Sequence, residues 1–421
     1  MKIGTIELLA FSKLPGVGSS TVREMVVSNL DLNELRKYEK DKAIKLFKGS
    51  KKEEAYIEFQ ENFSHYVDQA QYELDRYSAN DIQVVSFMDE KYPKLYRLLN
   101  DFPIFLYAKG NLKLLNHNYN IAVIGTRDNT NNGARIAKNT TTFFAENGYN
   151  IVSGLAKGID CIAHQAALDA KGFTTAVLTD LQKIYPKENR SLADRILDGG
   201  GLLIAEYPPG TPTQRSFFVE RDRLQSGLSL AVFPIETDIT GGTMHTVGFA
   251  QHQNRLIFCP DLRREKTNID EYPKSRGVIE LIKTEKARPY TREDYPAILE
   301  LLDKKALELG KDEFKHLSSH KKPIDSEGSR LKISTNSNTA EKQTPSKEKA
   351  NKPQNLEFLF VDSNSNNEDN LLSEQSSDLA DVEEKLLAEI SSLSERLGSA
   401  IEQLRQIRNN SKKQTTINLK L

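Results

Sequence analysis

The sequence is poor in cysteine and contains no long apolar run. Its two cysteines, Cys161 and Cys259, are too few for a disulfide framework or a four-thiolate metal site, and we expect both to be small buried residues. No stretch reaches the roughly 18 consecutive apolar residues that a membrane-spanning helix needs. The N-terminal MKIGTIELLAF has no convincing cleavage site for export. These absences predict a protein of the reducing cytoplasm that does not enter a membrane.

An excess of positive charge is also absent. Lysine and arginine number 58 and aspartate and glutamate number 59, so the formal net charge is -1 at pH 7. A nucleic-acid-binding surface on such a chain must be a local basic patch, and its binding should be sensitive to salt. The length of 421 residues is sufficient for two or three domains.

The stretch from Asn120 to His164 has the clearest pattern in the chain. Two apolar runs, Ile121–Ile124 and Tyr149–Val152, each end in a glycine turn that leads into a helical pattern. Short apolar strands that alternate with helices predict a parallel sheet, and both turns then lie side by side at its carboxyl edge, where doubly wound sheets bind ligands. Free backbone N–H groups beside a cation suit a phosphate. The candidate phosphate-binding residues of the two turns are Gly125, Thr126, Arg127, Ser153, Gly154, Lys157 and Gly158.

The same alternation continues towards Pro260 and predicts about six strands in an α/β fold with a Rossmann-like, doubly wound, mainly parallel sheet. The later strands are predicted at Thr174–Leu178, Gly201–Ala205, Leu230–Phe233 and Arg255–Phe258, and a separate earlier strand at Ile82–Phe87. Further basic and glycine residues fall on loops that this topology gathers at one edge, where an arginine can donate two N–H bonds to one phosphate. These additional candidates are Lys187, Arg190, Arg221, Arg223, Gly241, Gly242 and Thr243.

Several motifs of this region resemble the DNA-processing protein A family (DprA/Smf). They are VIGTR, SGLAKGID-x-x-AH, YPKEN and FFVERDRLQSGLS, the last similar to the family segment F-x-x-R-N-R-x-x-x-G-L-S. The resemblance implies a non-catalytic protein that binds single-stranded DNA and loads a RecA-type recombinase onto it during transformation or recombination. It also implies that Arg127 and a lysine of YPKEN contact DNA. Between the two arginines of this segment the family has asparagine, whereas this chain has Asp222. We expect the added carboxylate to weaken DNA binding.

Residues 1–80 are predicted to form a helical domain that precedes the Rossmann-like core of residues 81–262. The segment from Leu14 to Thr21, LPGVGSST, resembles a helix-hairpin-helix motif (SAM-like), whose glycine turn offers N–H groups to a DNA phosphate without reading sequence. A helical packing domain with an inherited turn is the alternative, and so short a motif leaves both open. We expect the aromatic residues of this domain in its core, with stacking on bases as the alternative. They are Tyr56, Phe59, Phe63, Tyr66 and Tyr72.

The C-terminal part changes composition twice. Residues 263–320 are predicted to be a charged helical extension without an assigned fold. Residues 321–375 are rich in Ser, Asn, Lys and Glu, which predicts a disordered linker because so few apolar side chains cannot offset the cost of ordering. Apolar residues at heptad spacing within residues 376–410 predict a coiled coil and hence a homo-oligomer. A single amphipathic helix that docks on its own chain is the alternative.

Three other chemistries compete with DNA binding as interpretations of these residues. The turn after the first strand reads GTRDN and not G-x-G-x-x-G, so we expect no dinucleotide cofactor. Asp160 and His164 are one helical turn apart, but no third metal ligand is evident and we expect no metal. Glu206 and Glu236 at strand ends, with the glycines of residues 241–242, faintly resemble the lysine-decarboxylase-like (LOG) phosphoribohydrolases. An enzyme that cleaves nucleotide N-glycosidic bonds is therefore the alternative function.

Overall fold

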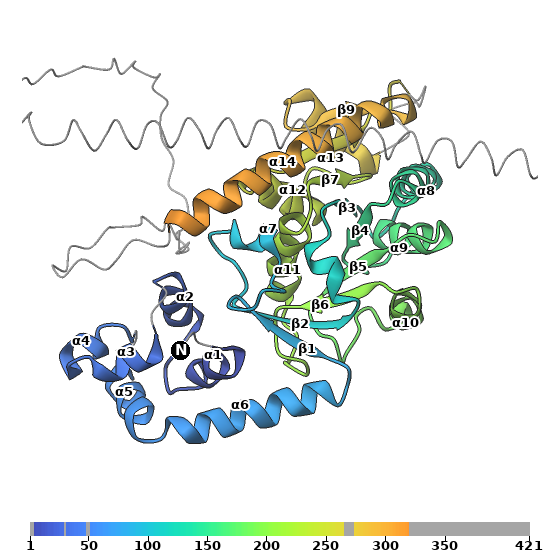
Figure 1. The fold of residues 1–421 in the computed structure, drawn as a ribbon. Coiled ribbons are helices and arrows are strands. Elements are labelled where there is room, and N and C mark those ends of the chain that lie inside the picture. The colour runs from blue at the N-terminus through green and yellow to red at the C-terminus, as the bar shows by residue number, and fades with distance from the viewer. Residues whose placement is uncertain (1–3, 29–30, 48–50, 265–272, 320–421) are drawn as a thin grey trace, which may run out of the picture. The chain divides into compact units, whose positions relative to one another are not determined.

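The structure is a computed structural model that describes residues 4–28, 31–47, 51–264 and 273–319 (Figure 1). All of these residues belong to one unit of the chain. The predicted linker at 321–375 and the predicted coiled coil at 376–410 lie outside the described residues. Within the described ranges, no helix is both long and apolar enough to cross a lipid bilayer.

The N-terminal region is helical, as predicted. Its elements are α1 (Thr5–Ser12), α2 (Ser19–Val27), α3 (Leu32–Lys37), α4 (Lys40–Ile44), α5 (Lys52–Glu61) and α6 (Phe63–Ser78). Aromatic rings hold them together: the centroid of Phe59 lies 5.9 Å from that of Phe11 and 5.1 Å from that of Phe63. The expectation that Tyr72 is a core residue is wrong, because its side chain is 69% exposed on α6.

The sheet has nine strands in the order β1-β2-β6-β5-β4-β3-β7-β8-β9. The strands are β1 (Gln83–Ser86), β2 (Phe105–Gly110), β3 (Asn120–Ile124), β4 (Asn150–Ser153), β5 (Thr174–Leu178), β6 (Leu202–Ala205), β7 (Ala231–Pro234), β8 (Leu256–Pro260) and β9 (Arg288–Tyr290). Strands β3 to β9 pair in parallel, whereas β2 is antiparallel to both β1 and β6. The Rossmann-like, mainly parallel sheet is confirmed.

Helices cover both faces of the sheet (Figure 1). One face packs against α8 (Asn131–Glu146), α9 (Ile159–Asp169) and α10 (Arg190–Asp198), and the other against α11 (Arg215–Gly227), α12 (Thr243–His252) and α13 (Arg276–Lys283). Alternate residues of β3 supply the two cores: Ile121 and Val123 face α8 and α9, whereas Ala122 and Ile124 belong to the opposite core. Both faces are buried, which explains why the strands read as continuous apolar runs.

The chain reverses its direction of winding at β3. From β3 the strands proceed through β4 and β5 to β6, and the chain then crosses back to place β7 on the other side of β3. Residue Ile121 pairs with Ile151 of β4 and with Ala231 of β7. The carboxyl ends of β3 and β7 therefore form the topological switch point, which is where sheets of this kind leave a crevice for a ligand.

Candidate nucleic-acid interface

A cavity of about 510 Å³ opens at this switch point. Its wall includes two of the predicted loops and one of the predicted arginines from α11. The predicted residues that line it are Gly125, Thr126, Arg127, Arg221, Gly241, Gly242 and Thr243. The structure thus brings together half of the predicted site from segments that are up to about a hundred residues apart in the chain.

The two glycine turns are in direct contact. The N–H of Ile159 donates to the carbonyl of Thr126 at 3.2 Å. Gly158 has a φ of +80°, and a Cβ there would lie 2.3 Å from the same carbonyl oxygen, so only glycine fits. Arg127 is exposed at the cavity and makes no hydrogen bond or ion pair within the described part of the chain. Its guanidinium is consequently available to an anion.

The amino end of α8 is already occupied by an internal carboxylate. Glu236, which follows β7 and is 1% exposed, accepts a hydrogen bond from the N–H of Thr130 at 2.8 Å. A Cβ on Gly133 would lie 2.3 Å from Glu236 Oε2, so the glycine makes room for the carboxylate. The expectation that this helix offers free N–H groups to a phosphate is therefore wrong at this position. A cofactor diphosphate would require the same place.

A second carboxylate engages the turn after β4. Asp160 accepts the N–H groups of Gly154 at 3.2 Å and of Ala156 at 3.4 Å. Ser153, which is buried, donates its hydroxyl to the carbonyl of Val123 at 2.7 Å. The expectation of free amides is wrong for Gly154 too, since these groups stabilise the turn itself. Lys157 remains exposed and pairs with Glu188 of the next loop at 3.0 Å. Such exposed pairs are weak and leave the ammonium group accessible.

Arg221 forms the floor of the cavity. It is 6% exposed and packs over Gly154 so closely that a Cβ on that glycine would lie 1.7 Å from its Nη1. Its Nε and Nη1 have no hydrogen-bond acceptor among the described residues, and Nη1 is 3.4 Å from Asp222 Oδ1. Burial raises the pKa of Asp160 to about 6, although the Arg221 charge acts in the opposite direction. The floor is therefore a buried cation that two carboxyl groups partly neutralise.

His164 completes the buried cluster below the cavity. Its Nδ1 is 2.7 Å from the Thr174 hydroxyl, which itself donates to the carbonyl of Ile151, so Nδ1 is the protonated nitrogen. Nε2 is buried without a partner among the described residues. Burial and then the Arg221 charge lower the pKa of His164 to about 3. The imidazole is therefore neutral at physiological pH and serves the packing of α9 on β5.

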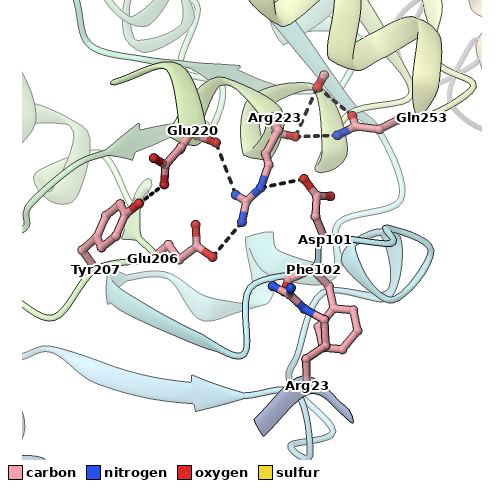
Figure 2. A network of polar contacts seen from close by, with 9 residues as sticks. Arg23, Asp101, Phe102, Glu206, Tyr207, Glu220, Arg223 and Gln253 are labelled. Atoms are coloured by element: carbon pink, nitrogen blue, oxygen red, sulfur yellow. Dashed lines mark hydrogen bonds and ion pairs between the residues drawn. The ribbon is translucent and has the colours of Figure 1, made fainter. Parts of the chain in front are cut away.

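Arg223 has a different environment from Arg221, although both are on α11. It is 8% exposed and binds two carboxylates, Asp101 at 3.0 Å and Glu206 at 2.7 Å (Figure 2). This environment does not support the prediction that Arg223 contacts DNA, since protein groups enclose its guanidinium. Lys187 in the loop after β5 and Arg190 at the start of α10 are exposed at the same edge of the sheet, outside the cavity lining.

Two features near the cavity were missed by the sequence patterns. Phe218 lines the cavity and its ring centroid lies 5.2 Å from that of Tyr185, which is 55% exposed. Both residues fall within motifs quoted above, but neither was singled out. Lys274 also lines the cavity, where it pairs with Asp128. No signal in the sequence connects Lys274 with Asp128, because they are 146 positions apart.

The glycine turn of the N-terminal region does not face this cavity. Val17 and Ser19 line a separate hollow of about 360 Å³ between α1, α2, α6 and β2, and Glu73 and Glu206 line it too. Both carboxylates are ion-paired, Glu73 with Lys13 and Glu206 with Arg223. Leu14 is buried at the start of the motif, and the N–H of Val17 in its turn already donates to the carbonyl of Leu14. The arrangement favours the packing alternative for residues 14–21 over phosphate binding.

Comparison with known proteins agrees with the earlier resemblance. The family model described as DNA recombination-mediator protein A matches residues 83–302, more than half of the chain. The DNA processing protein DprA of Bacillus subtilis is 36% identical over 187 residues, which are 44% of this chain and 63% of that protein. Protein Smf of Escherichia coli is 36% identical over 171 residues, 40% of this chain and 46% of that protein. The X-ray structure of DNA processing protein A from Streptococcus pneumoniae superposes with a TM-score of 0.54 at 28% identity and covers 69% of this chain and 96% of that one. The chain thus spans about half to two thirds of these curated relatives, and it belongs to the DNA recombination-mediator protein A family.

Proposed function

We propose that this protein binds single-stranded DNA along the carboxyl edge of its sheet and does so without catalysis. The observation that supports this most directly is Arg127, an exposed and unpaired guanidinium at a cavity whose floor is the buried Arg221. Guanidinium groups form paired N–H bonds with phosphate oxygens. Membership of a family named for DNA recombination makes a DNA phosphate the most reasonable anion.

The other exposed cations extend this site along the edge. Arg127 follows β3, Lys157 follows β4, and Lys187 and Arg190 follow β5, and these three strands are neighbours in the sheet. Adjacent strands are about 5 Å apart, so the loops present positive charge in a row. A row of cations binds a phosphate backbone without sequence preference.

A single strand is favoured over a duplex because two aromatic rings, one of them exposed, adjoin the row. Phe218 lines the cavity, and the ring of Tyr185, which is 55% exposed, lies beside it. Unpaired bases stack on such rings, whereas paired bases inside a duplex cannot reach them. The edge therefore combines backbone attraction with a surface for bases.

The phosphoribohydrolase alternative has less support. Glu206 forms an ion pair with Arg223, and Glu236 is buried against the amino end of α8. Neither carboxylate lines the cavity, whereas a catalytic acid or base must reach the scissile bond. Incubation with nucleoside monophosphates, followed by measurement of released base, tests this alternative.

Delivery of the strand to a RecA-type recombinase is a further part of the proposal. The family description, recombination-mediator protein, supports it. The test is whether the protein accelerates the DNA-dependent ATP hydrolysis of RecA on strands that a single-strand-binding protein already covers. The predicted homo-oligomer is tested separately, by light scattering before and after truncation at residue 375.

The central experiment compares Arg127→Ala with Lys113→Ala by fluorescence anisotropy of a labelled oligo-dT at several salt concentrations. Lys113 is exposed in the turn before β3, at the opposite edge of the sheet, and provides the same loss of charge. We expect Arg127→Ala to weaken binding and to reduce the salt slope by about 0.7, the value for one lost phosphate contact on a single strand. Equal affinities for the two variants would remove Arg127 from the site.

A further inference from the structure

The two arginines of α11 lie on different sides of the helix. Residues two positions apart on a helix do not share a face. Arg221 lines the cavity, and Arg223 is absent from its lining and faces the strand β2–β6 region instead. The same helix therefore connects the proposed DNA site with a second polar cluster, which Figure 2 shows.

Arg223 is the centre of this cluster. Its Nε is 3.0 Å from Asp101 Oδ2, its Nη2 is 2.7 Å from Glu206 Oε1, and its Nη1 donates to the backbone carbonyl of Glu220 at 3.3 Å (Figure 2). All three nitrogens of the guanidinium thus have protein partners. The fork fixes both the position and the rotation of α11, because two carboxylates on separate segments bind a planar group.

The segment that supplies Asp101 is also held by the N-terminal helices. Its neighbour Phe102 is buried, and its carbonyl accepts a hydrogen bond from Nη2 of Arg23 on α2 at 3.0 Å. The Arg23 guanidinium also lies 5.3 Å from the centroid of the Phe102 ring (Figure 2). A continuous set of contacts therefore runs from α2 through residues 101–102 to α11.

The backbone of Arg223 extends these contacts to a second wall of the cavity. Its carbonyl accepts a hydrogen bond from Gln253 Nε2 at 2.9 Å, and the Ser226 hydroxyl donates to Gln253 Oε1 at 2.7 Å. Gln253 is the residue that ends α12, whose first residue, Thr243, lines the cavity. Arg223 consequently contacts two of the helices that line the cavity, α11 and α12, whereas a third, α9, contributes Asp160.

We propose that Arg223 is a positioning residue that couples the docking of the N-terminal helices to the affinity of the cavity for DNA. It holds α11 directly, and α12 through Gln253, in the positions that place Arg221 and Thr243 at the cavity. The position of α2 affects the position of α11 through the contacts of Arg23, Phe102 and Asp101. The inference rests on the proposed DNA-binding function for its readout, and on the contacts of Figure 2 for its geometry.

The sharpest variant is Asp101→Asn, because the Asp101 side chain is 55% exposed and its replacement is isosteric. Coupling predicts weaker binding, with the Kd for oligo-dT raised about two- to fivefold as expected for a loosened ion pair near the surface, and an unchanged salt slope. A direct DNA contact by Arg223 predicts the reverse, since release from Asp101 would free its guanidinium and tighten binding. Asp198→Asn is the control: it removes one exposed carboxylate from the end of α10, at the amino edge of the sheet.

Arg23→Gln tests the coupling from the distal end of the contacts. It should raise the Kd in the same direction, and the double variant with Asp101→Asn should be less than additive, because both substitutions break one chain of contacts. A role in fold stability alone would lower the melting temperature without changing the Kd of the folded protein. An unchanged or lower Kd for Asp101→Asn, relative to Asp198→Asn, overturns the inference.

Hydrogen exchange without DNA separates this inference from the proposed function. Coupling predicts faster exchange of the amides in residues 215–227 and 243–252 of both variants, and no change in Asp198→Asn. If the wild type does not bind oligo-dT, the proposed function fails and the exchange result alone decides the coupling. Unchanged exchange in these two helices would then overturn it.

Discussion

Replacing Asp222 by asparagine should tighten DNA binding. Asp222 lines the cavity beside Arg221, with its Oδ1 3.4 Å from Arg221 Nη1 and its side chain 16% exposed. Asparagine keeps the carbonyl oxygen that accepts a hydrogen bond from Gln225 at 2.8 Å. The substitution therefore removes one negative charge and leaves the packing of the wall in place. It also restores the residue found in the family segment that this chain resembles.

The magnitude follows from Coulomb's law. A phosphate that approaches Arg221 from the cavity would lie about 7 Å from Asp222, where the repulsion is about 2 kcal/mol at an effective dielectric constant of about 20. Salt screening at physiological strength leaves about half of this. Removal of about 1 kcal/mol of repulsion corresponds to about fivefold tighter binding.

The same carboxylate makes the affinity dependent on pH. Burial raises the pKa of Asp222, and burial also raises that of Asp160 to about 6. Both groups lose their negative charge as the pH falls, so wild-type affinity should rise below about pH 6. The rise should be smaller in Asp222→Asn, which has lost one of the two titrating groups.

Fluorescence anisotropy with labelled oligo-dT at pH 7.5 and 5.5 measures both effects. Asp198→Asn is the matched control, because it makes the same change in net charge at the opposite edge of the sheet. Binding by Asp222→Asn that is no tighter than binding by this control would show that no phosphate lies near Asp222. The proposed path of the strand over the cavity would then be refuted.

Three further variants test the buried cluster and the aromatic surface. The folded-state pKa of His164 lies near 3, below its ordinary value of 6.5, so the unfolded chain takes up the proton first and stability is lost as the pH falls. Urea unfolding should show that wild type loses about 2 kcal/mol more than His164→Leu between pH 7 and pH 5; parallel profiles would contradict this. Gly154→Ala places a Cβ 1.7 Å from the arginine that packs over it and should lower the free energy of unfolding by about 1–3 kcal/mol, whereas Gly248→Ala, with no atom within 4 Å of its Cβ, should not. Tyr185→Ala should weaken oligo-dT binding by about 1–3 kcal/mol, and Tyr72→Ala on α6 should leave it unchanged; equal effects would exclude stacking on Tyr185.

The parallel core of the fold was readable in the sequence because each strand is buried on both faces. The predicted runs Thr174–Leu178 and Leu230–Phe233 differ from the observed strands by at most one residue at either end. Strand β9 was missed because Arg288-Pro289-Tyr290 contains a charge and a proline, and it pairs only with β8 at the edge. A strand of this composition is specified by its neighbour and not by its own residues.

The candidate site was only partly readable, for a similar reason. Glycine turns are local patterns, so the contact between Gly158 and Thr126 could be anticipated from the two motifs. Asp160, which occupies the amides of the second turn, lies in the same motif as that turn. Glu236 comes from a distant segment, 106 positions from Thr130, and could not be anticipated. Likewise, the sequence Arg221-Asp222-Arg223 does not reveal which face of the helix turns towards the ligand. The two arginines therefore looked equivalent, although Arg221 lines the cavity and Arg223 binds Asp101 and Glu206.

The carboxylate of Glu236 at the amino end of α8 determines whether this helix end depends on a bound nucleotide. In many sheets of this type, that helix end is completed by a dissociable diphosphate. Here a ligand that entered the same place would leave a displaced carboxylate charged and buried, which is strongly unfavourable. The helix end is complete as soon as the chain folds, and its state does not follow the nucleotide concentration of the cell.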